Sequence, residues 1–306
     1  MKYRKRLALK YFKPVNSDEI CELLLDSDDS LEESFGHFAL QKKSGALFLN
    51  RFGPDEIMAL MEKVGLVEHL HARGFRNLQL EIMRDEVQNH HLKVYDGTID
   101  PENLLINLRL SRSRFVPDQC FFNETKNKPV LDMVMIEWLS AEDPRAGFTP
   151  GRPQLPGQSR PGLGSLRHLI EIMYITGRIL MVDGFMDVPE HFHGAVMYSQ
   201  KFKFFDPVQE AVLQAILRDL KEYSLHDLSW GMLTKSIVDS STGRPEIYIP
   251  SEQVFPISRH LNKYYNSKLY RNSFMQAYGN KKYTLDYEAM LERKNKLLRN
   301  KRIEDL

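Results

Sequence analysis

The sequence predicts an α+β fold, in which a mixed, mainly antiparallel sheet is flanked by helices. Apolar and polar residues alternate over 78–83 and 104–110, as in strands with one face toward the core. Residues 130–139 are apolar at nearly every position, which is typical of a central strand. Helical spacing follows Pro54 and again Asp206-Pro207. We expect an N-terminal helical extension (1–53), a sheet domain (54–206) and a smaller C-terminal α/β appendage of helices and a hairpin (207–306).

The composition is that of an ordinary globular protein. The chain has 306 residues, of which 42% are hydrophobic and 27% charged, and its formal net charge is +1. This balance argues against nucleic-acid binding, and no apolar run approaches the ~20 residues that span a membrane. The basic stretches at 2–13 and 293–302 are interpreted as solvated faces.

The cysteines indicate a reducing compartment. Cys21 and Cys120 lie far apart in the sequence and provide neither a disulfide framework nor a cysteine zinc site. The basic start of the chain lacks the apolar segment of a signal peptide. We therefore expect a cytoplasmic protein that binds no membrane.

The first half of the chain predicts helices and then an antiparallel meander. Residues 16–19 are expected to cap a short helix, and Pro54 to open a longer one that Gly74 ends. Strands are expected over 78–83, 92–94 and 104–110, with Asp96-Gly97 as a turn.

The second half alternates between types of element. We expect the strand at 130–139 to be followed by an irregular stretch (140–161), a helix (163–177) and a buried strand (179–182). A helix opening at Pro189, a strand over 202–205 and a helix from Asp206 come next. A hairpin is expected around Ser241-Arg244, with helices near 256–266 and 286–302.

A glycine-rich loop opens the helix at 163–177. The first N–H groups of a helix have no intrahelical partner and lie at the positive end of its dipole, so they can bind phosphate. Gly162 and Gly164 allow an anion to approach the backbone, because they carry no Cβ. A plain turn is the alternative.

The order of these elements resembles the GNAT N-acyltransferase superfamily over residues 54–206, about half of the chain. In that family a Gln/Arg-x-x-Gly-x-Gly/Ala loop enters the first helix after the central strand and binds the pyrophosphate of acetyl-CoA. Gly162-Leu163-Gly164 matches the Gly-x-Gly part, whereas Ser159 occupies the Gln/Arg position. Gln158 and Arg160 lie beside it.

A late helix of the family reads roughly Asn-x-x-Ala-x-x-Leu-Tyr. Ala195-Val196-Met197-Tyr198 is similar to its end, with one residue fewer and Met for Leu, and Phe192 replaces the Asn. About twenty residues, 140–159, separate the expected central strand from the loop, where the family has only a few. Either they form an insertion over the active site or the strand lies elsewhere.

The resemblance implies a GNAT-like fold and an N-acyltransferase that uses acetyl-CoA or another acyl-CoA as co-substrate. The acyl group would pass directly from the thioester to an amine of a small molecule or a peptide. Tyr198 would protonate the departing thiolate. The residues expected to bind CoA are Gln158, Arg160, Gly162, Leu163, Gly164 and Ser165.

Glu137 is the candidate general base by its position. It interrupts an otherwise apolar strand, where burial would raise a carboxyl pKa toward neutrality. A solvent-facing or arginine-paired carboxylate is the alternative for Glu137, and a core aromatic is the alternative for Tyr198.

Two other functions stay open. The chain could be a binding or scaffold protein on a degenerate GNAT fold, with Pro153–Pro161 filling the cleft beside Gly162. It could also be a metalloenzyme using Glu190, His191 and His193, although this spacing does not place both imidazoles on one helix face, and we expect no metal. The appendage could form a homodimer.

Overall fold

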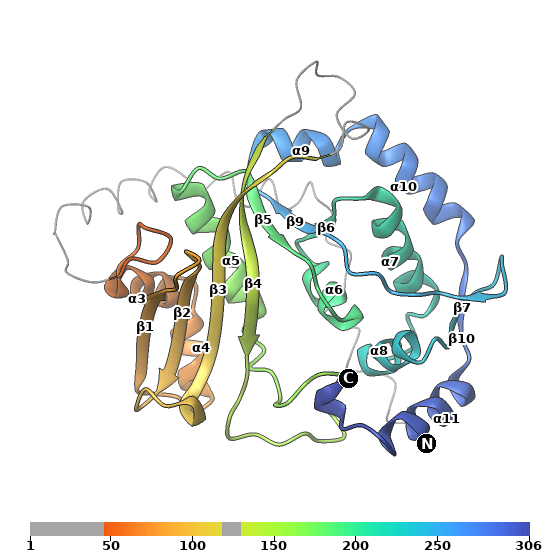
Figure 1. The fold of residues 1–306 in the computed structure, drawn as a ribbon, viewed down its shortest axis with the longest axis horizontal. Helices are drawn as coiled ribbons and strands as arrows, with labels where there is room; N and C mark the ends of the chain where they lie inside the picture. Colours follow the sequence, from red (N-terminus) through yellow and green to blue (C-terminus); the bar gives the residue numbers. More distant parts are fainter. Residues whose placement is uncertain (1–45, 118–129) are drawn as a thin grey trace.

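The computed structural model describes residues 46–117 and 130–306. Within these residues, one sheet has seven strands in the order β1-β2-β3-β4-β5-β9-β6, and a smaller sheet has the order β10-β7-β8 (Figure 1). All neighbours in the large sheet are antiparallel except β4 and β5. The mixed, mainly antiparallel α+β class is confirmed. The short helix expected after a cap at 16–19 and both cysteines lie outside the described residues.

The first three strands form the expected meander, and the strand expected at 130–139 pairs with its last strand. The strands of the large sheet are β1 (Leu78–Arg84), β2 (His90–Asp96), β3 (Leu104–Phe115), β4 (Leu131–Ala141), β5 (Gly184–Asp187), β9 (Gln253–Pro256) and β6 (Lys203–Phe204). Gly97 follows β2 with a φ of 89°, which suits the predicted turn. Between β3 and β4 the register shifts at Arg109/Leu110, so Glu137 is an extra, bulged residue of β4.

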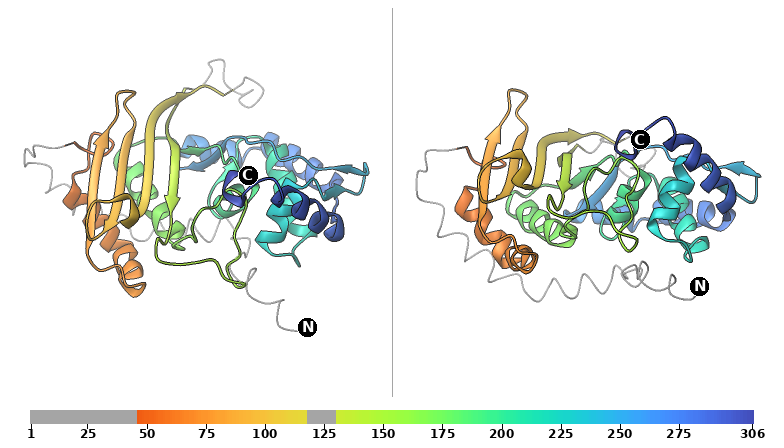
Figure 2. Two further views of the ribbon diagram at one scale, coloured as in Figure 1. Left: turned by 60° about the horizontal axis from the view of Figure 1, so that its bottom comes forward. Right: turned by 90° about the horizontal axis from the view of Figure 1, so that it is seen from below.

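Three helices cover one face of this meander. They are α3 (Pro54–Lys63), α4 (Leu66–Ala72) and α5 (Leu166–Ile179), and Figure 2 shows them on the same side of the strands. The single helix expected from Pro54 to Gly74 is two helices, because Gly65 adopts a left-handed φ of 73° between them. Their apolar faces and the sheet build the main core, in which Leu60, Leu70 and Met173 are buried.

The strand expected at 179–182 is wrong. Helix α5 continues to Ile179, and Met181 has a left-handed φ of 53° and is 87% exposed. The buried strand is β5, a few residues later. A short apolar run carries no period that separates a helix end from a strand.

The remaining elements form the C-terminal part. They are α6 (Phe192–Tyr198), α7 (Pro207–Asp219), α8 (Leu225–Leu233), β7 (Ile237–Asp239), β8 (Arg244–Pro245), α9 (Arg259–Tyr265), α10 (Lys268–Asn280), β10 (Tyr283–Leu285) and α11 (Tyr287–Leu298). The hairpin is confirmed as β7 and β8, but it is shorter than expected. The sequence did not predict α8, α10 or β9. Strand β9 joins the large sheet between β5 and β6, so this sheet continues across the boundary expected at 206.

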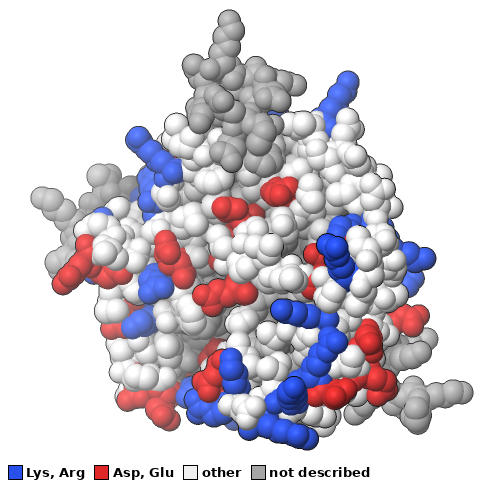
Figure 3. All heavy atoms as spheres, turned by 45° about the vertical axis from the view of Figure 1, so that its right-hand side comes forward, with Lys and Arg blue, Asp and Glu red and all other residues white. Residues whose placement is uncertain are grey.

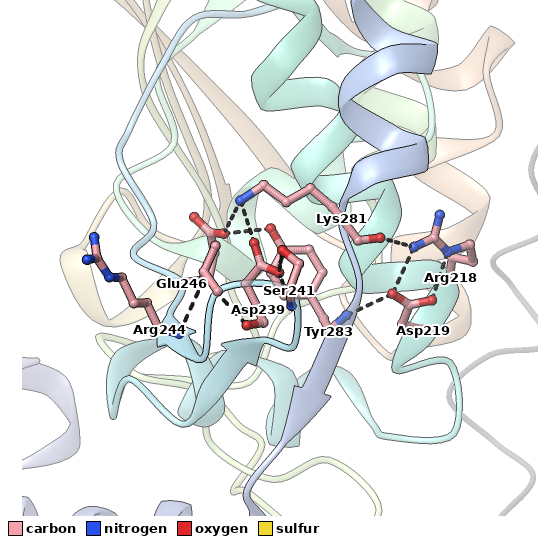
Figure 4. A network of polar contacts seen from close by, with 9 residues as sticks. Arg218, Asp219, Asp239, Ser241, Arg244, Glu246, Lys281 and Tyr283 are labelled. Carbon is pink, nitrogen blue, oxygen red and sulfur yellow. Dashed lines mark hydrogen bonds and ion pairs between the residues drawn. The ribbon is translucent and has the colours of Figure 1, made fainter.

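Charged side chains are abundant on the C-terminal part (Figure 3). A network of ion pairs stabilises the small sheet (Figure 4). Lys281 Nζ lies 2.9 Å from Asp239 and 3.3 Å from Glu246. Arg218 pairs with Asp219 at 2.8 Å. Asp219 also accepts the backbone N–H of Tyr283. These contacts tie α7 and the segment after α10 to the hairpin. In the described part of the chain, no helix is both long and apolar enough to span a membrane.

Candidate active site

Strands β4 and β5 separate at one end of the sheet (Figure 1). Their parallel pairing covers Met133–Met135 of β4 and Gly184–Met186 of β5, after which β4 continues to Ala141 paired with β3 but not with β5. Parallel strands that part in this way leave backbone groups and side chains at their carboxyl ends available to a ligand. The glycine-rich loop and α6 both lie at this end of the sheet.

The glycine-rich loop is held against the end of β4. The N–H of Leu163 donates to Ala141 O at 2.8 Å, and the N–H of Asp143 donates to Pro161 O at 2.8 Å. His69 Nε2 donates to Leu163 O at 2.9 Å. Because these bonds fix the chain up to Leu163, the following residue turns the loop into α5.

Gly164 makes that turn with a left-handed φ of 70° and remains exposed. Among the described residues, the backbone N–H groups of Gly164, Ser165, Leu166 and Arg167 have no acceptor. Ser165 is 1% exposed, and its Oγ also lacks a hydrogen-bond partner within the described ranges. The start of α5 therefore offers a run of unpaired donors beside a buried hydroxyl group.

Two arginines belong to this region. A Cβ on Gly164 would lie 3.4 Å from Arg73 Nη2, so this guanidinium lies beside the glycine. Arg73 is only loosely paired, at 3.8 Å from Asp143. Arg167 donates through Nε to His168 Nε2 at 3.1 Å, and His168 Nδ1 donates to Val64 O at 2.7 Å. Within the part of the chain that the structure describes, the other guanidinium nitrogens of Arg167 have no hydrogen-bond partner.

The expected CoA-binding residues divide into two groups. Gly162, Leu163, Gly164 and Ser165 build the start of α5, as predicted from the loop pattern. Gln158 instead closes its own turn, accepting the N–H of Leu155 at 3.2 Å. Arg160 lies close enough to Glu142 to oppose the rise that burial causes in the pKa of this carboxyl.

Tyr198 ends α6, beside the separation of β4 and β5. It packs on the main core, with its ring centroid 5.0 Å from that of Phe202. Burial first, and then the charge of Asp187, raise the pKa of its hydroxyl well above the usual range. Tyr198 therefore stays protonated at neutral pH and can act as a donor.

The burial expected for Glu137 is wrong. This residue is exposed, and its carboxylate accepts the Ser111 hydroxyl at 2.5 Å. Ser111 pairs with Met135, which packs against a separate apolar cluster that includes Leu131, Met133 and Val254, on the sheet face opposite α5. The β-bulge turned this position outward, and apolar neighbours in a sequence do not reveal a bulge.

The histidine cluster forms a stacked pair. The His191 and His193 rings lie 5.2 Å apart at 9°, and burial together with the charge of His191 lowers the pKa of His193 to about 4. Within the described residues, no group of three or more His, Cys, Asp or Glu side chains is placed to hold a metal ion.

Sequence reasoning missed Arg73 and Asp187. Arg73 follows α4 and reaches the loop only through the packing of α4 on α5, which no local pattern reveals. Asp187 ends β5, whereas the buried strand was expected at 179–182. Comparisons with protein-family models, with curated proteins and with solved structures found no match to this chain.

Proposed function

We propose that this protein is an acyl-CoA-dependent N-acyltransferase on a GNAT-like fold. One observation carries the proposal: within the described residues, four consecutive N–H groups at the start of α5 and the buried Ser165 hydroxyl have no hydrogen-bond partner, and the Arg73 guanidinium lies beside Gly164. A pyrophosphate is rich in acceptor oxygens and carries negative charge, so it complements these donors. The position of this site beside the separated β4 and β5 supports the same interpretation.

Acetyl-CoA, when bound, supplies the acyl group as a thioester. The acceptor nitrogen bonds to the carbonyl carbon, the carbon–sulfur bond breaks, and the nitrogen releases a proton to water. Tyr198 is proposed to protonate the sulfur and then to regain a proton from water; its raised pKa keeps the hydroxyl protonated at neutral pH but makes it a weaker acid than an exposed tyrosine. Glu137, the base expected from the sequence, lies on the sheet face opposite α5, so it could accept the proton only from an amine bound on that face.

A scaffold function would follow if residues 153–161 filled the phosphate site. Their turn instead contacts α6 and the C-terminal residues: the N–H of Gly157 donates to Ile303 O at 2.8 Å, and a Cβ on Gly157 would meet His191. Gly164 stays exposed beyond this turn. This placement favours a ligand site over a plugged one.

Calorimetric titration with acetyl-CoA tests the proposal. We expect one binding site in the natural protein and at least a tenfold weaker Kd when Arg73→Gln and Arg167→Gln are combined. Gly164→Glu should abolish binding, because it places bulk and negative charge at the donors. Arg112→Gln is the matched control, since Arg112 pairs with Asp132 on β3 and β4 and lies outside the loop. Lack of binding at millimolar acetyl-CoA would overturn the proposal.

The acceptor and the assembly remain part of the same proposal. The acceptor is an amine of a small molecule or a peptide, and the site is proposed to work in the cytoplasm without metal. A homodimer through residues 207–306 is proposed as well. Equilibrium sedimentation of the full chain checks the last point.

A further inference from the structure

Asp187 is the last residue of β5 and lies where β4 and β5 part. Side chains alternate along a strand, so Asp187 lies on the same face as Phe185, which is buried in the main core with α5. The residue remains partly exposed. From the described residues its carboxylate receives a hydrogen bond from the N–H of Val188 but no cation.

Gln253 faces Asp187 directly in the antiparallel register of β5 and β9. It is 0% exposed, and its Nε2 donates to Ala195 O at 3.2 Å, which fixes the orientation of the amide. Its Oε1 is buried and has no partner in the part of the chain that the structure describes. A buried acceptor without a donor is costly, so this oxygen indicates a missing donor.

These two residues present their acceptors on one face of the sheet. Cross-strand partners have Cβ atoms about 5 Å apart, so the partly exposed Asp187 lies beside the buried Gln253. Tyr198 and Tyr248 lie close enough for the charge of Asp187 to raise the pKa of each hydroxyl, in addition to the larger effect of burial. Tyr248 donates its hydroxyl proton to Pro189 O at 2.6 Å and is therefore not the missing donor.

An ammonium group matches this environment. It carries three N–H donors, no acceptor and a positive charge, and tyrosine rings attract cations. A hydroxyl group would leave the charge of Asp187 unbalanced. We propose that Asp187 and Gln253 bind the ammonium group of a primary alkylamine, which serves as the acyl acceptor. This role as acceptor rests on the proposed function, whereas amine binding itself does not.

Ligand-observed NMR of the full chain tests the subsite without acetyl-CoA. The probes are n-butylamine, putrescine and 2-phenylethylamine, each compared with its alcohol counterpart. We expect saturable binding of at least one amine at pH 8, no binding of its alcohol, and at least tenfold weaker binding to Asp187→Asn. Gln253→Met should weaken binding of the amine severalfold. Glu190→Gln, which changes an exposed nearby carboxylate, should leave amine binding unchanged.

The pH dependence separates this subsite from nonspecific attraction. Burial raises the pKa of Asp187 to about 7, so amine binding should weaken as the pH falls from 8 to 6. Tyr198 and Tyr248 stay neutral over this range, and Asp187→Asn should show no such change. Cooperative urea unfolding of Asp187→Asn would show that this variant is folded, whether or not acetyl-CoA binds.

Each result has a defined meaning. No amine binding at 50 mM, or equal binding by Asp187→Asn, overturns the subsite even if acetyl-CoA binds. Amine binding that depends on Asp187 supports the subsite even if acetyl-CoA does not bind, and that combination overturns the proposed acyl transfer alone.

Discussion

Asp187 and Gln253 face each other across β5 and β9, and both present acceptor oxygens to one face of the sheet. Neither residue has a cationic partner among the described residues. Burial therefore raises the pKa of the Asp187 carboxyl to about 7. The folded protein thus holds a proton on Asp187 that the unfolded chain has already lost, between about pH 4 and pH 7.

Asp187→Asn should therefore stabilise the protein at alkaline pH. The wild-type protein loses stability through Asp187 as the pH rises from about 4 to 7, because the unfolded chain binds fewer protons there. The full penalty above pH 7 is at most about 4 kcal/mol. Urea unfolding should show a difference between variant and wild type that grows from pH 4 and is constant above pH 7.

His193 provides a check on this result. Its pKa is lowered to about 4, so its contribution to stability rises with pH between about 4 and 6.5, opposite to that of Asp187. His193 is present in both proteins, and its contribution cancels in their difference. A difference that does not change with pH would contradict the burial of a charged Asp187.

Ser165→Ala should raise stability and weaken acetyl-CoA binding. Ser165 Oγ is buried without a partner in the described ranges and makes no capping hydrogen bond to α5. Removing this hydroxyl avoids the cost of burying it unpaired, so the free energy of unfolding should rise by about 1 kcal/mol. Ser236→Ala is the matched control: Ser236 is also 1% exposed but lies 3.0 Å from Thr234 Oγ1. That variant should lose about 1 kcal/mol. Thermal unfolding and calorimetry measure both effects, and destabilisation by Ser165→Ala would contradict the prediction.

Lys281→Met should destabilise the small sheet. Its ammonium balances Asp239 and Glu246, and it is partly exposed, so the expected loss is about 1–2 kcal/mol near neutral pH. Burial opposes ionisation of Asp239, but hydrogen bonds from Ser241 and Lys281 outweigh it and lower the pKa of this carboxyl. Stability from this group is present above pH 4 and lost as the pH falls through the lowered pKa.

The neighbouring Lys282 supplies the control for this network. It is exposed, so Lys282→Met should change stability by less than about 0.5 kcal/mol. Denaturant unfolding of both variants at pH 7 and pH 3 tests the prediction. Equal losses for the two variants, or a loss for Lys281→Met that persists at pH 3, would rule out the proposed balance of charge.

Gly157→Ala should release the turn that covers α6. Gly157 has a φ of 75°, and a Cβ there would lie 2.5 Å from His191 Nε2, so the substitution combines backbone strain with a clash. Gly74→Ala isolates the strain, because Gly74 has a φ of 91° and no atom within 4 Å of the added Cβ. We expect losses of about 2–3 kcal/mol and about 1 kcal/mol, respectively. Equal losses in thermal unfolding would mean that the turn does not rest on His191.

Several elements followed from local pattern alone. The start of α3 was predicted from Pro54. The strands of the meander were predicted from alternating apolar and polar residues. Asp206 accepts the N–H of Val208 at 2.7 Å and so begins α7 where a capping residue was expected. Each of these signals involves only a few neighbouring residues, so it can be recognised from the spacing of residues in the sequence.

The site depended on contacts between distant segments. Arg73 and Gly164 meet through helix packing, and Asp187 and Gln253 meet because β9 enters the sheet next to β5. Glu137 was expected to be buried, but a bulge in β4 turned it to the solvent. None of these relationships leaves a periodic signal, because each depends on strand order or register.

The sequence by itself determined the α+β class, the meander and a glycine loop that opens a helix, since backbone propensity and apolar periodicity act locally. Only the tertiary structure decided which donors at the start of α5 lack partners and which arginines approach them. It also decided that Asp187 and Gln253 share one face of the sheet. Burial and pairing depend on every segment that packs around a residue, so these properties exist only in the folded chain.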